Sequence, residues 1–203
     1  MTPSGLMSRL GLFLQPGFIP EDLCATLRHN LLTRTGEAAE VFVGEHGHLR
    51  PDIRRTIEVP VAETLRADVQ ARLHSIRPAL SNHFGVALIA SEGVGFLVYE
   101  PGGFYRPHRD RAGPDATPGG NETVRRRVSV VIFLNGASEA PGPFEYAGGR
   151  LTFYGLIDEP AWRDVGFPLD ADPGLLVAFD SAALHEVTPV AAGRRLSAVD
   201  WFY

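Results

Sequence analysis

The second half of the chain is a succession of short apolar runs, and this pattern restricts the possible folds more than any other feature. After Gly85, runs rich in β-branched and aromatic residues are separated by Gly, Pro and Asp, with no helical periodicity between them. Strands at such spacing are typical of an antiparallel sandwich or barrel. We therefore expect a jelly roll, or double-stranded β-helix, built from these runs: VGFLVYE, RVSVVIFLN, RLTFYG, GLLVAFD, HEVTPV and RRLSAVDWFY.

The first half carries two helical patterns that would support this β core. Pro20, Glu21 and Asp22 predict a helix start, because proline and acidic residues favour the first turn. A second helix is predicted over residues 61–84, ended by Gly85. The buried faces follow from helical spacing: Leu23, Leu27, Leu31 and Leu32 in the first helix, and Leu65, Val69, Leu73, Ile76 and Leu80 in the second.

These patterns predict an α+β fold that is mainly β. EVFVG and RRTIEVP read as short strands between the two helices, around a polar loop over residues 44–52. No repeat or low-complexity linker divides the chain, so we interpret residues 1–203 as one domain. Residues 1–85 would form the helical support with its short strands, and residues 86–203 the jelly-roll core.

The composition excludes several kinds of chemistry. All 19 basic residues are arginine, so Schiff-base chemistry and the phosphate-binding lysine of P-loop enzymes are ruled out. The single cysteine, Cys24, excludes an internal disulfide and a multi-cysteine metal site. A net charge of −5 without a basic tail argues against a nucleic-acid partner. Any metal must therefore be bound by His, Asp or Glu, and any anion by Arg.

We expect no membrane partner. The apolar run near the N-terminus is interrupted by Arg9 and ended by Pro16, which makes it too short to span a bilayer. Because this run also lacks a basic segment before it, the default expectation is a cytoplasmic protein. The sequence gives no indication of the oligomeric state.

A candidate metal site begins in the segment YEPGGFYRPHRD. His108 and Asp110 are two residues apart, so on a strand both side chains would leave the same face. His185 lies 75 residues beyond Asp110, after the run GLLVAFDS, and a jelly roll can bring the two strands together. Two imidazoles and one carboxylate can occupy one face of an octahedral iron(II) and leave three positions open.

An arginine and a serine follow at suggestive positions. Arg195 comes ten residues after His185, and Ser197 lies two further on and hence on the same face of a strand. A guanidinium with a hydroxyl can bind the far end of a dicarboxylate. Arg194 is the competing candidate, but on a strand it would face the opposite way and remain solvated.

These segments resemble the iron(II)- and 2-oxoglutarate-dependent oxygenases, and in particular the prolyl-4-hydroxylase-like branch that includes the PKHD-type hydroxylases. The resemblance rests on YEPGGFYRPHRD, RVSVVIFLN, AGGRLTF, GLLVAFDSAALHEVTPV and GRRLSAVDWF, and covers residues 94–203. Earlier residues are similar only in their order of helix and strand.

The resemblance implies a set of ligands. His108, Asp110 and His185 would bind Fe²⁺, and Arg195 would pair with the far carboxylate of 2-oxoglutarate, assisted by Ser197. Tyr99 matches a tyrosine that often hydrogen-bonds this co-substrate. Phe133 stands where some relatives have a tyrosine, so that hydroxyl contact would be missing here. Dioxygen would be the oxidant, and ascorbate is a candidate reductant.

The predicted function is hydroxylation of a C–H bond in an amino acid, peptide or small metabolite, with release of succinate and carbon dioxide. Two alternatives stay open. One is a jelly-roll protein that binds metal without catalysis, and the other is a cupin-type dioxygenase that does not use 2-oxoglutarate. The sequence does not decide between a small-molecule substrate and a peptide.

Arginines near the metal motif raise a hypothesis about the substrate. Arg106 and Arg127, with Tyr105, are candidate substrate-binding residues, and a basic rim would favour an anionic substrate. The Gly- and Pro-rich loop 112–121 has the composition of a lid. The loop 44–52 contains His46 and His48, which we interpret as surface residues, although this region could lie over the mouth of the site.

Overall fold

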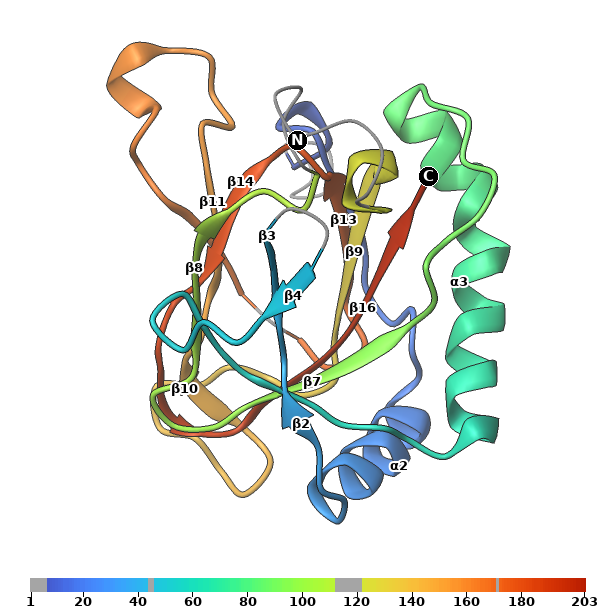
Figure 1. Ribbon diagram of the computed structural model, residues 1–203, viewed down its shortest axis with the longest axis vertical. Coiled ribbons are helices and arrows are strands. Elements are labelled where there is room, and N and C mark those ends of the chain that lie inside the picture. Colours follow the sequence, from blue (N-terminus) through green and yellow to red (C-terminus); the bar gives the residue numbers. More distant parts are fainter. Residues whose placement is uncertain (1–6, 44–45, 112–121, 171) are drawn as a thin grey trace.

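The computed structural model describes residues 7–43, 46–111, 122–170 and 172–203. Its main elements are two β-sheets that face each other and two long helices that pack on one of them (Figure 1). The larger sheet has seven strands in the order β1-β13-β9-β16-β7-β6-β2, and the smaller has five in the order β12-β11-β14-β8-β5. The two sheets build the predicted double-stranded β-helix, so the expected fold class is confirmed.

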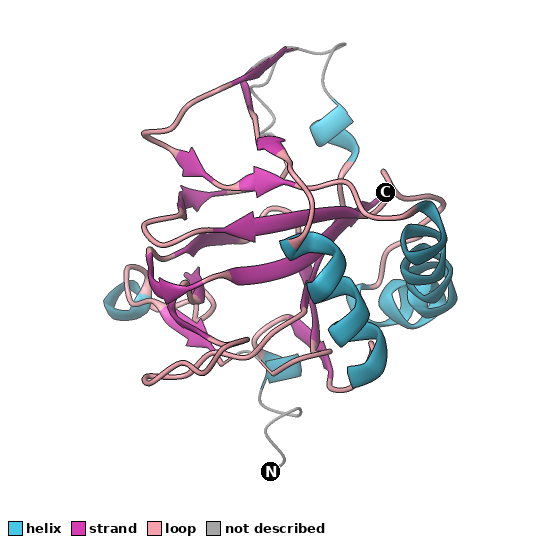
Figure 2. Ribbon diagram, turned by 90° about the horizontal axis from the view of Figure 1, so that it is seen from below, coloured by secondary structure: helices cyan, strands magenta, loops and turns pink. Residues whose placement is uncertain are grey.

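Both long helices cover the outer face of the seven-stranded sheet (Figure 2). Helix α2 spans Glu21–Leu32, with Pro20 at its N-cap position. Helix α3 spans Glu63–Phe84 and ends at Gly85, whose φ of 64° is in the left-handed region that glycine adopts without strain. Both helices therefore lie where the apolar periodicity predicted them. The structure also has two short 3₁₀ helices, η1 Glu122–Arg125 and η2 Pro160–Trp162, and a short helical segment at residues 7–9.

The central strands are buried on both faces. In β9, Val128, Val130 and Ile132 pack toward the helices, whereas Val131 and Phe133 face the smaller sheet. Because successive side chains alternate between the faces, two separate hydrophobic clusters share the same strands. The strands of this sheet are β1 Leu12–Gln15, β2 Glu37–Ala38, β6 Ile57–Glu58, β7 Gly95–Tyr99, β9 Val128–Phe133, β13 Leu176–Asp180 and β16 Arg195–Phe202.

The smaller sheet carries His108 and His185, the two histidines of the candidate metal site. Its strands are β5 Arg54–Arg55, β8 Phe104–His108, β11 Leu151–Tyr154, β12 Phe167–Leu169 and β14 Leu184–Val187. Two further pairs of strands lie outside these two sheets: β3 Val41–Val43 with β4 His46–His48, and β10 Tyr146–Gly148 with β15 Val190–Gly193.

Two local predictions differ from the structure. Part of the expected loop 44–52 is strand β4, because its backbone pairs with β3. Asp110 lies beyond the end of β8 and not on a strand, because the Arg111 N–H donates to the Ser181 carbonyl (2.8 Å) and turns the chain. The predicted lid 112–121 lies outside the described residues. No described helix is both long and apolar enough to cross a bilayer.

Candidate active site

The three predicted metal ligands lie together at the inner face of the smaller sheet. Strands β8 and β14 are antiparallel neighbours in which His108 is directly opposite His185. One Asp110 carboxylate oxygen lies 3.4 Å from His108 Nε2 and the other lies 3.7 Å from His185 Nε2. One ligand atom from each residue lies within 4.8 Å of the other two, so a single ion fits between them. Among the described residues this is the only such group of three.

Both histidines are oriented through their second ring nitrogen. His108 Nδ1 lies 2.8 Å from the Arg106 carbonyl, and His185 Nδ1 lies 3.0 Å from the Ala183 carbonyl. Because a carbonyl oxygen only accepts, each Nδ1 must donate a proton to it. Each Nε2 then keeps its lone pair on the side facing Asp110, which is the tautomer that a metal requires.

The charge states of the site suit a cation. Burial, reinforced by the neighbouring His108, lowers the pKa of His185 to about 4, so this imidazole is neutral near pH 7. Burial opposes ionisation of Asp110, but the imidazoles of His185 and His108 when protonated, together with the Ser129 hydroxyl, hold the pKa of this carboxyl well below its usual range. An ionised carboxylate beside a neutral imidazole is the combination that binds a metal ion.

Aromatic rings enclose the histidines. The Tyr105 ring stacks on His108 with centroids 3.4 Å apart, and Phe179 meets His185 edge-on at 4.7 Å. The Arg54 guanidinium lies on the Tyr105 ring, 4.9 Å from its centroid. Burial raises the pKa of Tyr105 to about 12, so its hydroxyl stays protonated. These contacts leave His108 and His185 little freedom to rotate.

Arg195 is buried deep between the two sheets. Its side chain is on β16, opposite Tyr99 of β7, and the residue is only 1% exposed. One terminal nitrogen donates to the Ser197 hydroxyl at 3.0 Å, whereas Nε has no hydrogen-bond partner. The guanidinium is flanked by Tyr99 at 5.0 Å and Phe133 at 5.2 Å, measured to the ring centroids. No described carboxylate forms an ion pair with it.

Arg194 has the opposite environment. It is exposed, and its Nε donates to the Glu100 carboxylate at 2.9 Å. The strand alternation therefore turns Arg195 inward and Arg194 outward, as the spacing predicted. Gly149 makes room for the inward side chain, because a Cβ there would lie 3.2 Å from Arg195 Cδ.

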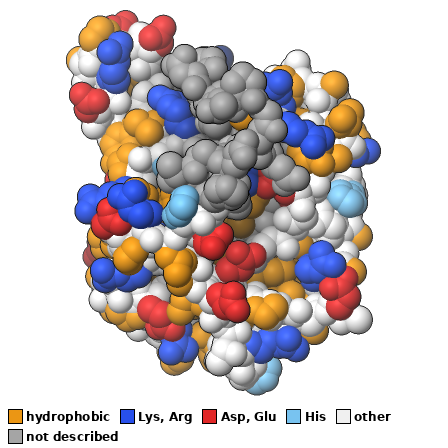
Figure 3. All heavy atoms as spheres, in the orientation of Figure 1, with side chains coloured by type: hydrophobic (Ala, Val, Ile, Leu, Met, Phe, Trp, Pro, Cys, Tyr) orange, Lys and Arg blue, Asp and Glu red, His pale blue; other side chains and the backbone are white. Residues whose placement is uncertain are grey.

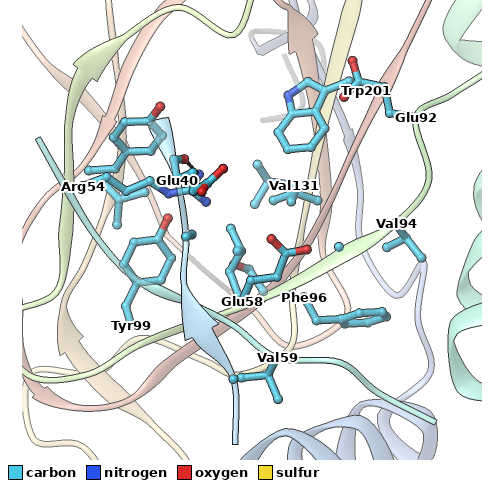
Figure 4. A pocket seen from close by; sticks show the side chains of 18 of the residues that line it. Glu40, Arg54, Glu58, Val59, Glu92, Val94, Phe96, Tyr99, Val131 and Trp201 are labelled. Atoms are coloured by element: carbon cyan, nitrogen blue, oxygen red, sulfur yellow. Dashed lines mark hydrogen bonds between the residues drawn. The ribbon is translucent and has the colours of Figure 1, made fainter. Parts of the chain in front are cut away.

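One cleft of about 1670 Å³ connects these groups. Its lining includes His108, Asp110 and His185 together with Arg195 and Ser197. Figure 4 shows Tyr99 and Arg54 on one wall of this cleft, and Trp201 with Glu92 on the opposite wall. The metal-binding group and the buried guanidinium thus open into one shared space.

Some predicted residues do not reach this space. Tyr105 lines the cleft, but Arg106 and Arg127 are exposed and are not among its described lining residues. Arg106 instead donates to the Asp52 carbonyl at 2.5 Å. The structure therefore brings together the metal motif, Arg195, Ser197, Tyr99 and Tyr105, and leaves two arginines outside.

Sequence reasoning missed three residues that contribute to the site. Ser129 bonds to Asp110 and to the Ser181 hydroxyl, the latter at 2.9 Å. Tyr146 is buried beside Arg195. Burial raises the pKa of Tyr146, and the positive charge of Arg195 partly offsets this rise. Arg126 pairs with Glu92 through two contacts of 2.7 and 2.6 Å and stacks on Trp201. Ser129 lies within the segment RVSVVIFLN and Tyr146 directly precedes AGGRLTF, but neither segment indicated a role for these residues.

Comparisons with known proteins agree with this geometry. Residues 94–203 match the family described as the 2OG-Fe(II) oxygenase superfamily. The chain is 30% identical over 192 residues to a PKHD-type hydroxylase of Stenotrophomonas maltophilia (strain R551-3), covering 92% of this chain and 75% of that protein. It is also 27% identical to a Pseudomonas putida prolyl-4-hydroxylase of known crystal structure, with a TM-score of 0.67, covering 95% of this chain and 91% of that one.

A more distant structure shares the fold. A Trichoplax adhaerens prolyl hydroxylase, in complex with a hypoxia inducible factor peptide fragment, has a TM-score of 0.63 at 18% identity and covers 100% of this chain and 94% of that one. The family match includes every residue from the metal motif to the C-terminus, and the relatives extend the similarity through the supporting helices. The chain therefore belongs to the 2OG-Fe(II) oxygenase superfamily and is an oxygenase of the PKHD and prolyl-hydroxylase type.

Proposed function

We propose that His108, Asp110 and His185 hold Fe²⁺, and that Arg195 and Ser197, beside Tyr99, hold 2-oxoglutarate. The observation that carries this proposal is the buried Arg195, which has an unpaired Nε and no carboxylate partner among the described residues. A buried charge without a partner is strongly unfavourable, so the fold favours an anion at this position. The far carboxylate of 2-oxoglutarate supplies that anion.

The residues also fit the metal. Two imidazoles and one ionised carboxylate on one side of an ion leave its other positions open for ligands. When iron(II) and 2-oxoglutarate are bound, they supply the oxidation of a C–H bond by dioxygen, with release of succinate and carbon dioxide. The chain itself orients the ligands through the Arg106 and Ala183 carbonyls and keeps water from the guanidinium with Tyr99 and Phe133.

The substrate is proposed to be a residue in a peptide. Two of the structural neighbours are described as prolyl hydroxylases, and one of these is in complex with a peptide fragment. The cleft of about 1670 Å³ exceeds the usual range of roughly 300–1,000 Å³ for small-molecule sites, which also favours an extended substrate. Ascorbate as reductant, a cytoplasmic location, the absence of a nucleic-acid partner and one catalytic unit over residues 1–203 remain part of this proposal.

The test measures metal binding and 2-oxoglutarate turnover separately. We expect His108→Ala, Asp110→Ala and His185→Ala each to abolish Mn²⁺ or Fe²⁺ binding in calorimetry and to stop succinate formation. His74→Ala, which removes an exposed histidine of α3, is the matched control and should change neither. Wild-type metal affinity in any one of the three variants would remove that residue from the ligand set.

The two alternatives would give different results. A metal-binding protein without catalysis would bind Mn²⁺ but form no succinate with any peptide or with 2-oxoglutarate alone. A dioxygenase that does not use 2-oxoglutarate would not bind this molecule, and Arg195→Gln would leave its activity intact. The family match and the buried Arg195 favour the 2-oxoglutarate enzyme over both.

A further inference from the structure

Three glutamates from the N-terminal half line the same cleft. Glu37 lies on β2, Glu58 on β6, and Glu40 in the segment between β2 and β3. All three are exposed, and none of their carboxylates forms an ion pair within the described ranges. Figure 3 shows acidic side chains gathered near the middle of the face on which β2 and β4 lie in Figure 1.

Two of these glutamates are directly opposed. In the β2–β6 pair, Glu37 is the register partner of Glu58, so both side chains stand on the same face. Like charges directly opposite each other on neighbouring strands are destabilising. The arrangement therefore weakens this sheet edge, and fold stability does not explain it.

Glu58 extends into the cleft. A Cβ added to Gly95 would lie 3.3 Å from Glu58 Oε1, so the carboxylate lies over the bare backbone of β7. Figure 4 shows the Glu58 carboxylate turned into the cavity, directly below Val131 in this view. Because Gly95 has no side chain, the Glu58 carboxylate has room to lie at this position.

None of the arginines that line the cleft forms an ion pair with Glu37, Glu40 or Glu58. Arg126 is paired with Glu92, and Arg66 with Glu63. Arg54 lies over the Tyr105 ring and donates to the Glu40 carbonyl through a terminal nitrogen, while its Nε has no hydrogen-bond partner. Arg109 donates to the Ala182 carbonyl. Arg195, 1% exposed with an unpaired Nε, lines the same cleft and marks its anion-binding part. The cleft thus has its most deeply buried arginine, Arg195, at one end and glutamates without an ion pair at the β2–β6 edge.

We propose that the substrate carries a positively charged side chain, an ammonium or a guanidinium, which binds between Glu37, Glu40 and Glu58. The proposal rests on the proposed function, because it assigns the substrate to the cleft that contains the metal group. It reverses the hypothesis of an anionic substrate, since Arg106 and Arg127 lie outside the described lining. In a peptide, the cation would be a lysyl or arginyl residue near the hydroxylated one.

The test compares three blocked prolyl peptides that differ only in the residues flanking proline: lysine, glutamine or glutamate. Binding is measured by calorimetry on the Mn²⁺-loaded full chain with 2-oxoglutarate, so no turnover is needed. We expect the lysyl peptide to bind about fivefold tighter than the glutaminyl peptide, and the glutamyl peptide to bind weakest. The lysyl advantage should shrink between 50 and 500 mM NaCl, since salt screens exposed charges.

Variants assign the effect to these glutamates. Glu58→Gln and Glu37→Gln should each remove most of the lysyl advantage, whereas Glu139→Gln, an exposed glutamate outside the described lining, should preserve it. Both cleft variants should keep or raise the melting temperature, because each relieves the opposed charges. A lost advantage accompanied by a lower melting temperature would indicate a structural role and overturn the proposal.

The remaining outcomes are also decisive. A lysyl peptide that binds no tighter than the glutaminyl one, including no detectable binding of any peptide, would overturn the inference. An advantage that persists in both cleft variants would do the same. The proposed function fails differently, by loss of Mn²⁺ or 2-oxoglutarate binding in the wild-type chain, and those two affinities are measured first in the same titrations.

Discussion

At the scale of single residues, the site contains two buried arginines, of which Arg195 lacks an ion pair and Arg126 has one. Arg195 is 1% exposed, with two aromatic rings beside its guanidinium. Nearby, Arg126 has a two-contact pair with Glu92. The fold therefore satisfies a buried arginine where no ligand is needed and leaves a second one available for an anion.

Replacing Arg195 should affect the co-substrate and leave the metal site intact. We expect Arg195→Gln to weaken 2-oxoglutarate binding by about 2–5 kcal/mol, roughly thirty- to several-thousand-fold, because the variant removes the charge but keeps hydrogen-bond donors. Mn²⁺ affinity should hardly change. Calorimetry on the Mn²⁺-loaded protein measures both constants.

Arg194→Gln is the matched control for this experiment. Its side chain is exposed and paired with Glu100, so the variant should bind 2-oxoglutarate like the wild type. If the control lost affinity and Arg195→Gln did not, the assignment of the two arginines would be reversed.

Ser129 should act through Asp110. Its hydroxyl bonds to Asp110 and to Ser181, and both serines are buried. Because partners of metal-binding carboxylates orient them, we expect Ser129→Ala to reduce Mn²⁺ affinity about 10- to 100-fold. Ser138→Ala, in a loop away from the cleft lining, is the control. Unchanged affinity in the Ser129 variant would show that the carboxylate needs no such support.

The sequence predicted the residues of the site that lie within short motifs, and little else. His108, Asp110, His185 and Arg195 were identifiable because their spacing and family resemblance are local signals. Tyr146 and Ser129 were not, because each reaches the site through packing between strands distant in the chain. The basic rim was a hypothesis drawn from arginines near the metal motif, yet nearness in the sequence does not specify which side of a strand a residue occupies.

At the scale of elements, the long periodic helices were predictable from the sequence, and some of the short strands were not. Helix α3 begins two residues after the predicted start and ends at the predicted residue. Strands β10 and β12 were missed, because YAG and FPL are short and contain glycine or proline, which weaken strand signals. Their pairing depends on neighbours from elsewhere in the chain.

The α3 interface should carry much of the stability. Leu73 is fully buried between this helix and the seven-stranded sheet. Leu73→Ala should lower the free energy of unfolding by about 2–5 kcal/mol, because it leaves a cavity in a packed layer. Urea denaturation followed by circular dichroism measures the change. Thr64→Ala, on the exposed face of the same helix, should change it by less than about 0.5 kcal/mol.

Cys24 offers a chemical probe of α2. Burial raises the pKa of this thiol to about 11, so below that pH it stays protonated as well as inaccessible. Because only the thiolate is nucleophilic, we expect almost no reaction with Ellman's reagent at pH 8 in the folded protein. The thiol should react stoichiometrically after unfolding in urea. Rapid labelling without denaturant would show that α2 opens from the sheet.

At the scale of the whole molecule, the ligands of the cleft should stabilise the entire fold. A ligand that binds only the folded chain at a hundred times its Kd adds about 2.7 kcal/mol. For a chain of 203 residues this corresponds to a rise in Tm of about 5–10 °C. We expect Mn²⁺ and then 2-oxoglutarate to raise Tm in succession in a thermal melt. The Arg195→Gln variant should keep the rise in Tm caused by Mn²⁺ and lose the rise caused by 2-oxoglutarate.

The alternation of side chains between the two faces of β16 also limits which insertions and deletions the gene can tolerate. Arg195 and Ser197 face the cleft, while Leu196 and Ala198 face the helices. Inserting or deleting one codon before Arg195 would exchange the two sets, burying a guanidinium among leucines and directing apolar side chains at the ligand. Homologous genes should therefore vary in length at loops such as the one between β11 and β12, while β16 changes only by substitution. Gene libraries with random single-codon insertions, selected for folded protein, would map this boundary directly.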